Sequence, residues 1–501
     1  MAKRDNRKSQ KQLPPEEKFK INSFSDLKIE NLKNVIRYNP YAWMLLGLIF
    51  IGCILRFVNL GFNSLWLDEG ATFDIAQNTF VGIWETTMGG EVNPPLFYWM
   101  ESVMLLLGTS EFILRFIPAL MGCLTIPVLY FVGKEVGGKL CGIVTAGLLT
   151  FSSFHVYYSQ EARAYTTMLF FFSLVLLFYL IALKTNKIWC WILSGLFASL
   201  AFWTHFYVFV GIAILYLHAI IVNWKKIREN MKSVLPILAS MGTFLLVSLP
   251  LIVVTVGLFI IRTSSEPTWG YSGFDLIYST LYLLSGSEMY LTVIFTIMAI
   301  VGIVWLFRTK ENRYNSLFIL LSLVLTFVIS VFLAEKMPIN PRHLMFILPF
   351  FFVAVGAAFT IIPKEIDYKK VGVVLLILIC LVNLPYFTTY YTSYSKEDWR
   401  GMSQELNDVT TDGDYVVTIP SYVNLPLDYY YDNSSDKTIE KGATTAKDLE
   451  QIDIERGAHS AYYVVTGDIY AANPNGDALM WLNYNSVPVT QTSGIYLFKS
   501  V

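Results

Sequence analysis

Ser64-Leu-Trp-Leu-Asp-Glu-Gly70 is the stretch that organises the chain, because it places two adjacent carboxylates at a membrane surface. A charge-poor run from about Tyr41 to Leu60 precedes it, is long enough to cross a bilayer, and gives way at once to polar residues. Charges held between apolar segments at such a surface are costly to desolvate, so Asp68 and Glu69 are candidates for function. The alternative for this stretch alone is an ordinary solvated loop that contains two acids.

The composition is that of a multi-pass membrane protein. Of the 501 residues, 54% are hydrophobic and only 15% are charged, and the mean hydropathy is +0.50. A net charge of −1 gives no global field that favours nucleic acid. The five cysteines lie in apolar stretches without metal-ligand spacing, so we expect small core residues and no disulfide framework. Residues 1–40 are basic and form a predicted cytosolic tail rather than a signal peptide.

We predict about eleven membrane-spanning helices, with further helices lying on the outer face. The run Leu96 to Leu107 is too short to span, and residues 274–288 form a second predicted outer-face helix. The loops then assigned to the cytosol hold fourteen Lys and Arg residues against five on the other side, which predicts the N-terminus inside and the C-terminus outside. The spans are expected at about 41–60, 112–133, 139–157, 165–183, 188–203, 206–223, 234–261, 290–308, 315–334, 343–362 and 371–388.

Three segments at the outer ends of predicted spans carry ionisable side chains toward the same face as Asp68. They are Tyr157 to Tyr165 with Glu161 and Arg163, Thr204-His205, and Pro338 to His343 with Arg342. Each has a structural alternative, since Arg163 can pair with Glu161 and a neutral histidine can bond to backbone. Their convergence on the face of the acidic loop favours a site.

The composition changes to that of a soluble domain at about Ser395. We predict a small α/β domain over residues 395–501, outside the membrane, with helices at 398–409 and 444–453 and strands at 415–419, 462–466 and 494–499. The transmembrane part is assigned to residues 41–390, with a first outer loop at 61–111. A polar loop between Arg262 and Tyr271 is a candidate cover over the site.

Arginines and carboxylates at one membrane surface suit the transfer of a group from a lipid phosphate. The planar guanidinium fits phosphate oxygens, and a phosphate held in the membrane belongs to a lipid. If a sugar is attached to that phosphate, one carboxylate must orient and deprotonate an acceptor hydroxyl, while the leaving phosphate mainly needs its charge neutralised. Glycoside hydrolysis differs, since it needs two carboxylates.

In order along the chain, Leu65-Trp-Leu-Asp-Glu69, Asn93-Pro-Pro95, Phe112-Ile-Leu-Arg115, Tyr158-Ser-Gln-Glu161-Ala-Arg163 and Pro341-Arg-His343 resemble the GT-C superfamily over residues 40–390. The nearest relatives in this resemblance are protein O-mannosyltransferases and the aminoarabinose transferase of lipid A. The resemblance implies a polyprenyl- or dolichyl-phosphate-linked monosaccharide donor, an extracytoplasmic acceptor and inversion at the anomeric carbon. It also implies roles for individual residues: Asp68 as catalytic base with Glu69 and Glu161 beside it; Arg163, Arg342 and His343 on the donor phosphate; Asn93, Tyr158, Gln160, Tyr165 and His205 on substrate; and Glu69, Glu91 and His205 as candidate ligands for a divalent metal ion.

Two other functions remain open at this stage. A transporter or flippase of lipid-linked sugars would also place charges on a membrane path, although it predicts repeats and broken helices near the midplane that the sequence does not show. A non-enzymatic assembly protein would use residues 395–501 to bind partners. The sequence identifies neither the sugar, nor the lipid, nor the acceptor.

Overall fold

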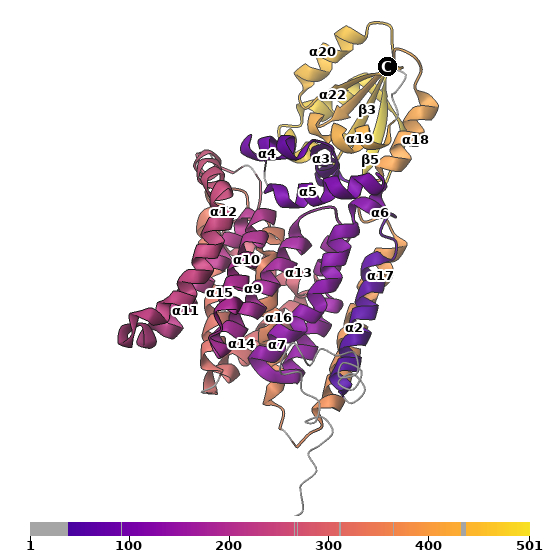
Figure 1. Ribbon diagram of the computed structural model, residues 1–501. Helices are drawn as coiled ribbons and strands as arrows, with labels where there is room; N and C mark the ends of the chain where they lie inside the picture. Colours follow the sequence, from indigo (N-terminus) through magenta and orange to yellow (C-terminus); the bar gives the residue numbers. More distant parts are fainter. Residues whose placement is uncertain are drawn as a thin grey trace, which may run out of the picture.

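A computed structural model describes residues 39–91, 93–264, 266–267, 269–309, 312–363, 365–431 and 437–501. The predicted cytosolic tail, residues 1–40, lies almost wholly outside these ranges. A bundle of apolar helices carries a layer of short helices at one end, and a small sheet domain sits on that layer (Figure 1).

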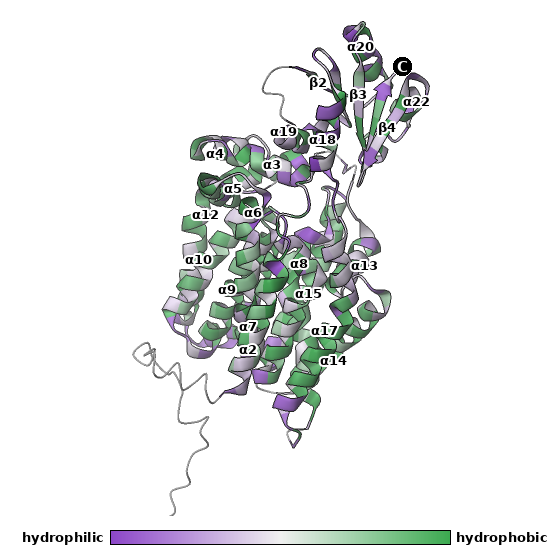
Figure 2. Cartoon of the chain, turned by 90° about the vertical axis from the view of Figure 1, so that its right-hand side faces the viewer, coloured by the Kyte–Doolittle hydropathy of each residue, from purple (hydrophilic) through white to green (hydrophobic). Residues whose placement is uncertain are grey.

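Long apolar helices form the bundle (Figure 2), and many of their large hydrophobic side chains are exposed on its outside. The first, α2, begins at Pro40 because the Asn39 side chain accepts a hydrogen bond from the amide of Tyr41. Within the described residues, nine helical segments are long and apolar enough to cross a membrane: Pro40–Phe57 (α2), Glu111–Thr150 (α6 and α7), Tyr165–Thr185 (α9), Phe206–Glu229 (α11 with η4), Met231–Arg262 (α12 with η5), Met289–Arg308 (α14), Arg313–Ala334 (α15), Pro341–Ile361 (α16 with η6 and η7) and Tyr368–Thr392 (α17).

The segment α7 (Phe116–Thr150) is a hairpin of two helical arms. Gly138 has φ 83°, and a Cβ placed on Gly133 would lie 2.8 Å from the Thr145 hydroxyl. In one straight helix these two residues would be about 18 Å apart. The second arm continues into α8 (Ser153–Ser159), and together they form the predicted crossing at 139–157. Adding this arm and the 17-residue α10 (Ile188–Thr204) to the nine long segments gives eleven helical passages among the described residues, which is the number of spans that the sequence predicts.

Short helices cover the outer end of the bundle. They are α3 (Leu67–Ala76), α4 (Phe80–Met88), α5 (Pro95–Met104) with η3 (Leu105–Leu107), and α6 (Glu111–Leu114), so the run from Leu96 to Leu107 is a surface helix as predicted. The helix α13 (Gly273–Leu284) ends four residues earlier than expected. The loop before it is held against the chain that leads to Arg342, because the Tyr271 amide donates to the Ile339 carbonyl at 2.8 Å.

The C-terminal residues form a five-stranded sheet in the order β2-β1-β3-β5-β4. Strands β2, β1 and β3 are parallel, whereas β5 and β4 are antiparallel additions. The sequence predicts β1, β3 and β5 but not the largely exposed edge strands β2 and β4. The elements are β1 (Tyr415–Ile419), β2 (Ile439–Gly442), β3 (Ala461–Thr466), β4 (Ser486–Thr492), β5 (Ile495–Ser500), α18 (Trp399–Val409), η8 (Ser421–Val423), α19 (Asn424–Tyr430), α20 (Ala446–Arg456), α21 (Ile469–Ala472) and α22 (Asp477–Asn485).

The sheet domain presents the carboxyl ends of its parallel strands to the surface helices. Thr466 at the end of β3 pairs with Ile495, so the turn between β4 and β5 lies at the same edge. Helix α19, which follows β1, packs on α3 at Gly70, where an added Cβ would lie 2.9 Å from the Pro426 nitrogen. A side chain at position 70 would therefore push the two parts of the chain apart.

Candidate active site

Asp68 and Glu69 lie in the first turn of α3, where negative charge is favoured by the helix dipole. Adjacent residues on a helix point about 100° apart, so the two carboxylates meet different partners. Glu69 is fully buried, whereas the Asp68 side chain keeps 23% of its surface exposed. The pair therefore divides into two clusters.

Asp68 contacts two arginines that come from distant parts of the chain. Its Oδ2 lies 3.2 Å from Nη1 of Arg342 and 3.9 Å from Nε of Arg163. Arg163 is fixed from the other side, since its Nη1 donates to the Asp68 carbonyl at 3.1 Å and to the Thr72 hydroxyl at 3.2 Å. We call Asp68, Arg163 and Arg342 the Asp68 cluster.

Several polar atoms of the Asp68 cluster are buried without a hydrogen bond. They include Oδ2 of Asp68 and the Nε groups of Arg163 and Arg342, because the ionic contacts between them lack hydrogen-bond geometry. Such atoms are rare in folded proteins and need an explanation. Two guanidinium donors and one carboxylate acceptor left in this way are suited to a ligand that carries both an anion and a hydroxyl.

In contrast, both carboxylate oxygens of Glu69 accept hydrogen bonds. Its oxygens lie 2.8 Å from Nε and Nη2 of Arg115 and 2.8 Å from Nζ of Lys396, and the Ala162 amide donates to it at 2.7 Å. Burial would raise the pKa of Glu69, but Arg115 and Lys396 outweigh it and lower the pKa to about 2. We call these three side chains the Glu69 cluster.

Arg115 explains why this cluster sits where it does. Beyond Glu69, its guanidinium donates to the carbonyls of Leu60, Asn63 and Ser64, which lie between α2 and α3. The arginine thus ties the start of α7 to the acidic loop. The catalytic and metal-binding roles predicted for Glu69 do not fit these surroundings, because no face of its carboxylate is open to a substrate or an ion.

Glu161 is the third predicted acid, and it lies next to Lys396 of the Glu69 cluster. It is fully buried, its carboxylate accepts no hydrogen bond from any described residue, and Nζ of Lys396 is 4.0 Å away. Burial raises the pKa of Glu161 to about 7, with Lys396 opposing and Glu69 reinforcing the shift. A carboxyl that titrates near neutral pH in a crowded site is a candidate for proton transfer.

Aromatic rings surround the guanidinium of Arg342. It lies 5.5 Å from the centre of the Trp66 ring and 5.8 Å from that of Tyr165, both within the range of cation–π attraction. Tyr165 in turn packs on His205 and His343, at 5.6 and 6.3 Å between ring centres. Burial lowers the pKa of His205 to about 3, with Arg163 and Arg342 adding to the effect, so this ring is neutral.

The three remaining predicted substrate residues are Tyr158, Asn93 and Gln160, and the side chain of Gln160 bonds to helix ends rather than to the Asp68 cluster. The Tyr158 ring packs on Tyr165 at 5.2 Å. Asn93 is buried beside Glu91, which accepts a hydrogen bond from the Tyr98 hydroxyl at 2.7 Å. Gln160 instead donates to the carbonyls of Arg56 and Val58 and accepts from Tyr390, so its side chain holds helix ends together.

The predicted metal ligands do not assemble. In the part of the chain that the structure describes, no three His, Cys, Asp or Glu side chains lie close enough to hold a metal ion. Glu69 is occupied by two cations, and Nδ1 of His205 accepts a hydrogen bond from the Tyr207 amide. We therefore assign no metal site to this group.

Two residues of the site were not predicted as such. Lys396 belongs to none of the motifs quoted above, yet it reaches both Glu69 and Glu161. Trp66 was quoted only as part of a motif, yet its ring lies near Arg342 and, at 5.9 Å, near Lys396. The only signal in the sequence was their position, since Trp66 and Lys396 each lie within two residues of acidic residues in segments assigned to the outer face.

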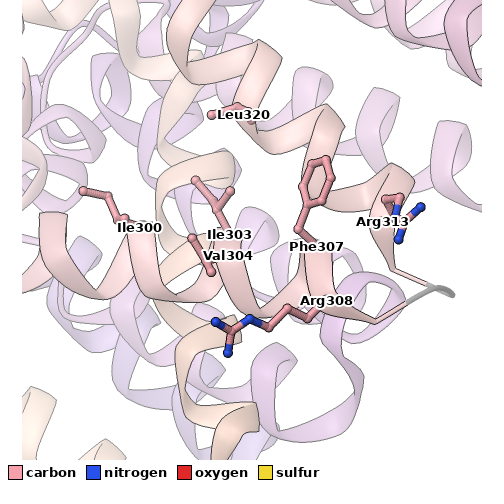
Figure 3. A pocket seen from close by; sticks show the side chains of 7 residues that line it. All are labelled: Ile300, Ile303, Val304, Phe307, Arg308, Arg313 and Leu320. Atoms are coloured by element: carbon pink, nitrogen blue, oxygen red, sulfur yellow. The ribbon is translucent and has the colours of Figure 1, made fainter.

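An apolar groove of about 370 Å³ is lined in part by Phe206, the residue that follows His205 in the sequence. It is lined by residues of α10, η4, α11, α12 and α15, among them Phe206, Tyr207 and Phe259. A larger cavity of about 620 Å³ lies between α14 and α15, where Arg308 and Arg313 are its only charged residues (Figure 3). That cavity contains none of the predicted site residues, whereas the groove is lined by Phe206 and Tyr207, which directly follow His205 in the chain.

Comparison with known proteins gives one family and several similar folds. Residues 92–253 match the family model described as dolichyl-phosphate-mannose-protein mannosyltransferase. A comparison with curated proteins gives no match. Among solved structures, the apo state of ArnT from Cupriavidus metallidurans is similar with a TM-score of 0.56 and 14% identity, covering 92% of this chain and 98% of that chain.

Two ligand-bound structures are also similar. ArnT from Cupriavidus metallidurans bound to undecaprenyl phosphate has a TM-score of 0.54 and 14% identity, over 92% of this chain and 98% of that one. The archaeal oligosaccharyltransferase AglB from Archaeoglobus fulgidus, in complex with an inhibitory peptide and a dolichol-phosphate, has a TM-score of 0.54 and 14% identity, over 92% and 74%. These likenesses confirm the predicted fold, a bundle of membrane-spanning helices with a small C-terminal α/β domain.

Proposed function

We propose that this chain is a GT-C membrane glycosyltransferase that moves a monosaccharide from a polyprenyl or dolichyl phosphate to an acceptor outside the membrane. The observation that carries the proposal is the Asp68 cluster, where buried guanidinium donors and a carboxylate oxygen without hydrogen bonds meet at the outer end of the bundle. The family match and the lipid phosphates named for similar structures support the same reading.

The donor phosphate is placed on Arg163 and Arg342. Their Nε groups are buried and lack acceptors, and phosphate oxygens match the planar fork of an arginine. The polyisoprenyl chain would follow the apolar groove beside Phe206, which opens between helices of the bundle. The rings of Tyr165 and His205, with Tyr158 and Asn93 nearby, would surround the sugar, which is a hexosyl or pentosyl group. His343, whose ring lies 5.7 Å from that of His205, would contact the donor phosphate.

Asp68 is assigned the role of base. The acceptor hydroxyl gives its proton to the Asp68 carboxylate as its oxygen forms a bond to the anomeric carbon. The bond from that carbon to the phosphate oxygen breaks, and its electron pair leaves with the lipid phosphate, whose charge Arg163 and Arg342 neutralise. Attack opposite the leaving group inverts the anomeric carbon.

The proposed place of the chain is the cell membrane, with the N-terminus in the cytosol and residues 395–501 outside. This orientation still rests on the charge count of the loops. A protease added to intact cells should cut within 395–501, and cleavage only after permeabilisation would contradict the orientation.

The function is tested by giving the purified chain, in lipid nanodiscs, radiolabelled monosaccharides linked to undecaprenyl or dolichyl phosphate, together with a cell-envelope extract that supplies acceptor hydroxyls. We expect release of the lipid phosphate and transfer of the sugar, with mass spectrometry of surface glycans from cells with and without the protein identifying the acceptor. A flippase would instead move the intact lipid-linked sugar across a vesicle without cleaving it. Translocation without cleavage of any donor would overturn the proposal.

A further inference from the structure

A cavity of about 340 Å³ lies where the sheet domain meets the acidic loop. Both parts of the chain form its walls, and its size falls in the range of about 300 to 1,000 Å³ that is typical of small-ligand sites. The residues that line it are Trp66 and Tyr157 from the membrane part, Tyr394, Ser395, Lys396 and Glu397 from the segment that enters the sheet domain, and Ser493 and Gly494 from the turn between β4 and β5.

The position of the cavity in the sheet domain is one at which ligands commonly bind. The turn at Ser493 and Gly494 lies at the carboxyl edge of the parallel strands, because it precedes Ile495, which pairs with Thr466. Open α/β sheets bind ligands outside the carboxyl ends of their strands. Here that edge faces α3, so a ligand at the edge also contacts the membrane part.

The walls combine aromatic rings with hydrogen-bonding groups. Trp66, Tyr157 and Tyr394 offer apolar faces, and Tyr394 is held by stacking on Phe62 at 4.9 Å. Ser395, Ser493 and the carboxyl of Glu397 offer polar atoms between them. A pyranose presents the matching surface, since its C–H face packs on aromatic rings while its hydroxyls take hydrogen bonds.

The charges of the walls favour a neutral ligand. Nζ of Lys396 is held 2.8 Å from Glu69, so a positive charge already lies in the wall and opposes a cationic ligand. Glu397 accepts a hydrogen bond from the Trp399 indole at 2.9 Å, and no described residue forms an ion pair with it. Burial raises the pKa of Glu397 to about 7, with Asp468 adding to the shift, so the charged carboxylate is already disfavoured here and an anionic ligand would disfavour it further.

The cavity adjoins the reacting groups through Trp66. The same indole ring lies 5.5 Å from the guanidinium of Arg342, which contacts Asp68, and 5.9 Å from Nζ of Lys396, which contacts Glu161. Trp66 is also only two residues before Asp68. A ligand packed on this ring therefore lies beside Arg342, the partner of the carboxylate that must take a proton.

From this geometry we infer that the cavity is the acceptor site and that the acceptor is a neutral carbohydrate, stacked on Trp66 and hydrogen-bonded by Glu397 and Ser493. The inference rests on the proposed function and names the acceptor class for it. The carbohydrate hydroxyl gives its proton to Asp68, its oxygen bonds to the anomeric carbon of the donor sugar, and the lipid phosphate leaves with the electron pair of the broken bond.

The inference is tested by saturation-transfer NMR on the full chain in nanodiscs, with methyl α-D-glucopyranoside and methyl N-acetyl-β-D-glucosaminide as probes. We expect the parent to bind a methyl glycoside, and Glu397→Ala and Ser493→Trp to weaken that binding at least about tenfold, the first by removing a hydrogen bond to a carboxylate and the second by filling the cavity. Glu405→Ala and Tyr484→Ala, on exposed residues of the same domain, are matched controls that should bind as the parent does.

Three results would overturn the inference. They are no binding of either glycoside by the parent, unchanged binding in both cavity variants, and preferential binding of a serine-containing peptide or an amine such as ethanolamine. Donor cleavage measured on the parent separates this failure from that of the proposed function. Cleavage without glycoside binding would overturn the acceptor site alone, whereas glycoside binding without cleavage of any donor would overturn both.

Discussion

Asp68 and Glu69 are neighbours in the sequence, yet the two clusters around them differ in every property that matters for chemistry. Glu69 is fully buried and matched by Arg115 and Lys396 at 2.8 Å, with a backbone amide completing its hydrogen bonds. Asp68 is partly exposed, and its two arginines keep donors that have no acceptor. A saturated cluster holds a fold together, whereas an unsaturated one is ready for a ligand.

The largest effect that would test this contrast is loss of folding in Glu69→Ala. The substitution leaves Arg115 and Lys396 buried without their anion, which typically costs about 3–5 kcal/mol. We expect a much lower thermal midpoint in detergent, with little folded protein recovered. Asp68→Ala is the matched control, and equal stability of the two variants would remove the distinction between the clusters.

The next effect is on donor affinity. Arg342→Ala and Arg163→Ala should each weaken binding of a polyprenyl-phosphate sugar by about 10- to 100-fold, because each removes a charged hydrogen-bond donor. Lysine should restore little, since it cannot reproduce the planar fork. Arg400→Ala, an outer-face arginine paired with Glu111, should bind donor as the parent does.

If both arginines only held helix ends, the variants would lose thermal stability without a selective loss of donor affinity. Measuring both quantities on the same preparations therefore decides between a binding role and a purely structural one.

A smaller effect concerns Glu161 and pH. Its pKa is raised from 4.5 to about 7, mainly by burial, so the folded chain holds this proton more tightly than the unfolded chain does. The stability that this provides is present below pH 4.5 and is lost as pH rises toward 7. The thermal midpoint of the parent should therefore fall relative to that of Glu161→Gln between pH 5 and pH 8, and parallel curves would show that Glu161 does not titrate in this range.

The smallest effect belongs to an ion pair of the same charge types on the surface. Lys225 and Glu229 are one helical turn apart in sequence, their charged atoms are 4.0 Å apart, and both side chains are largely exposed. Lys225→Ala should change the unfolding free energy by less than about 0.5 kcal/mol, because such pairs are weak in water. A loss comparable to that of Glu69→Ala would mean that burial is not what separates the clusters.

Much of this arrangement could be predicted from the sequence. Apolar runs of membrane length mark the nine long segments found among the described residues, and Asp68, Arg163 and Arg342 stand out because charge is unusual at the ends of such runs. The split between Asp68 and Glu69 could not be predicted, since it depends on Lys396, which lies 327 residues along the chain from Glu69. The contacts of Gln160 could not be predicted for a related reason, because its partners Arg56 on α2 and Tyr390 on α17 are brought to it only by packing.

The central claim is that Asp68 performs the chemistry while Glu69 holds the fold. The most direct measurement is single-turnover transfer from a polyprenyl-phosphate sugar by Asp68→Asn, with the thermal midpoint and donor affinity measured on the same sample. We predict a rate roughly 10² to 10⁴ times lower, as expected for loss of a general base, in a protein that melts with the parent. A rate within tenfold of the parent would contradict the account.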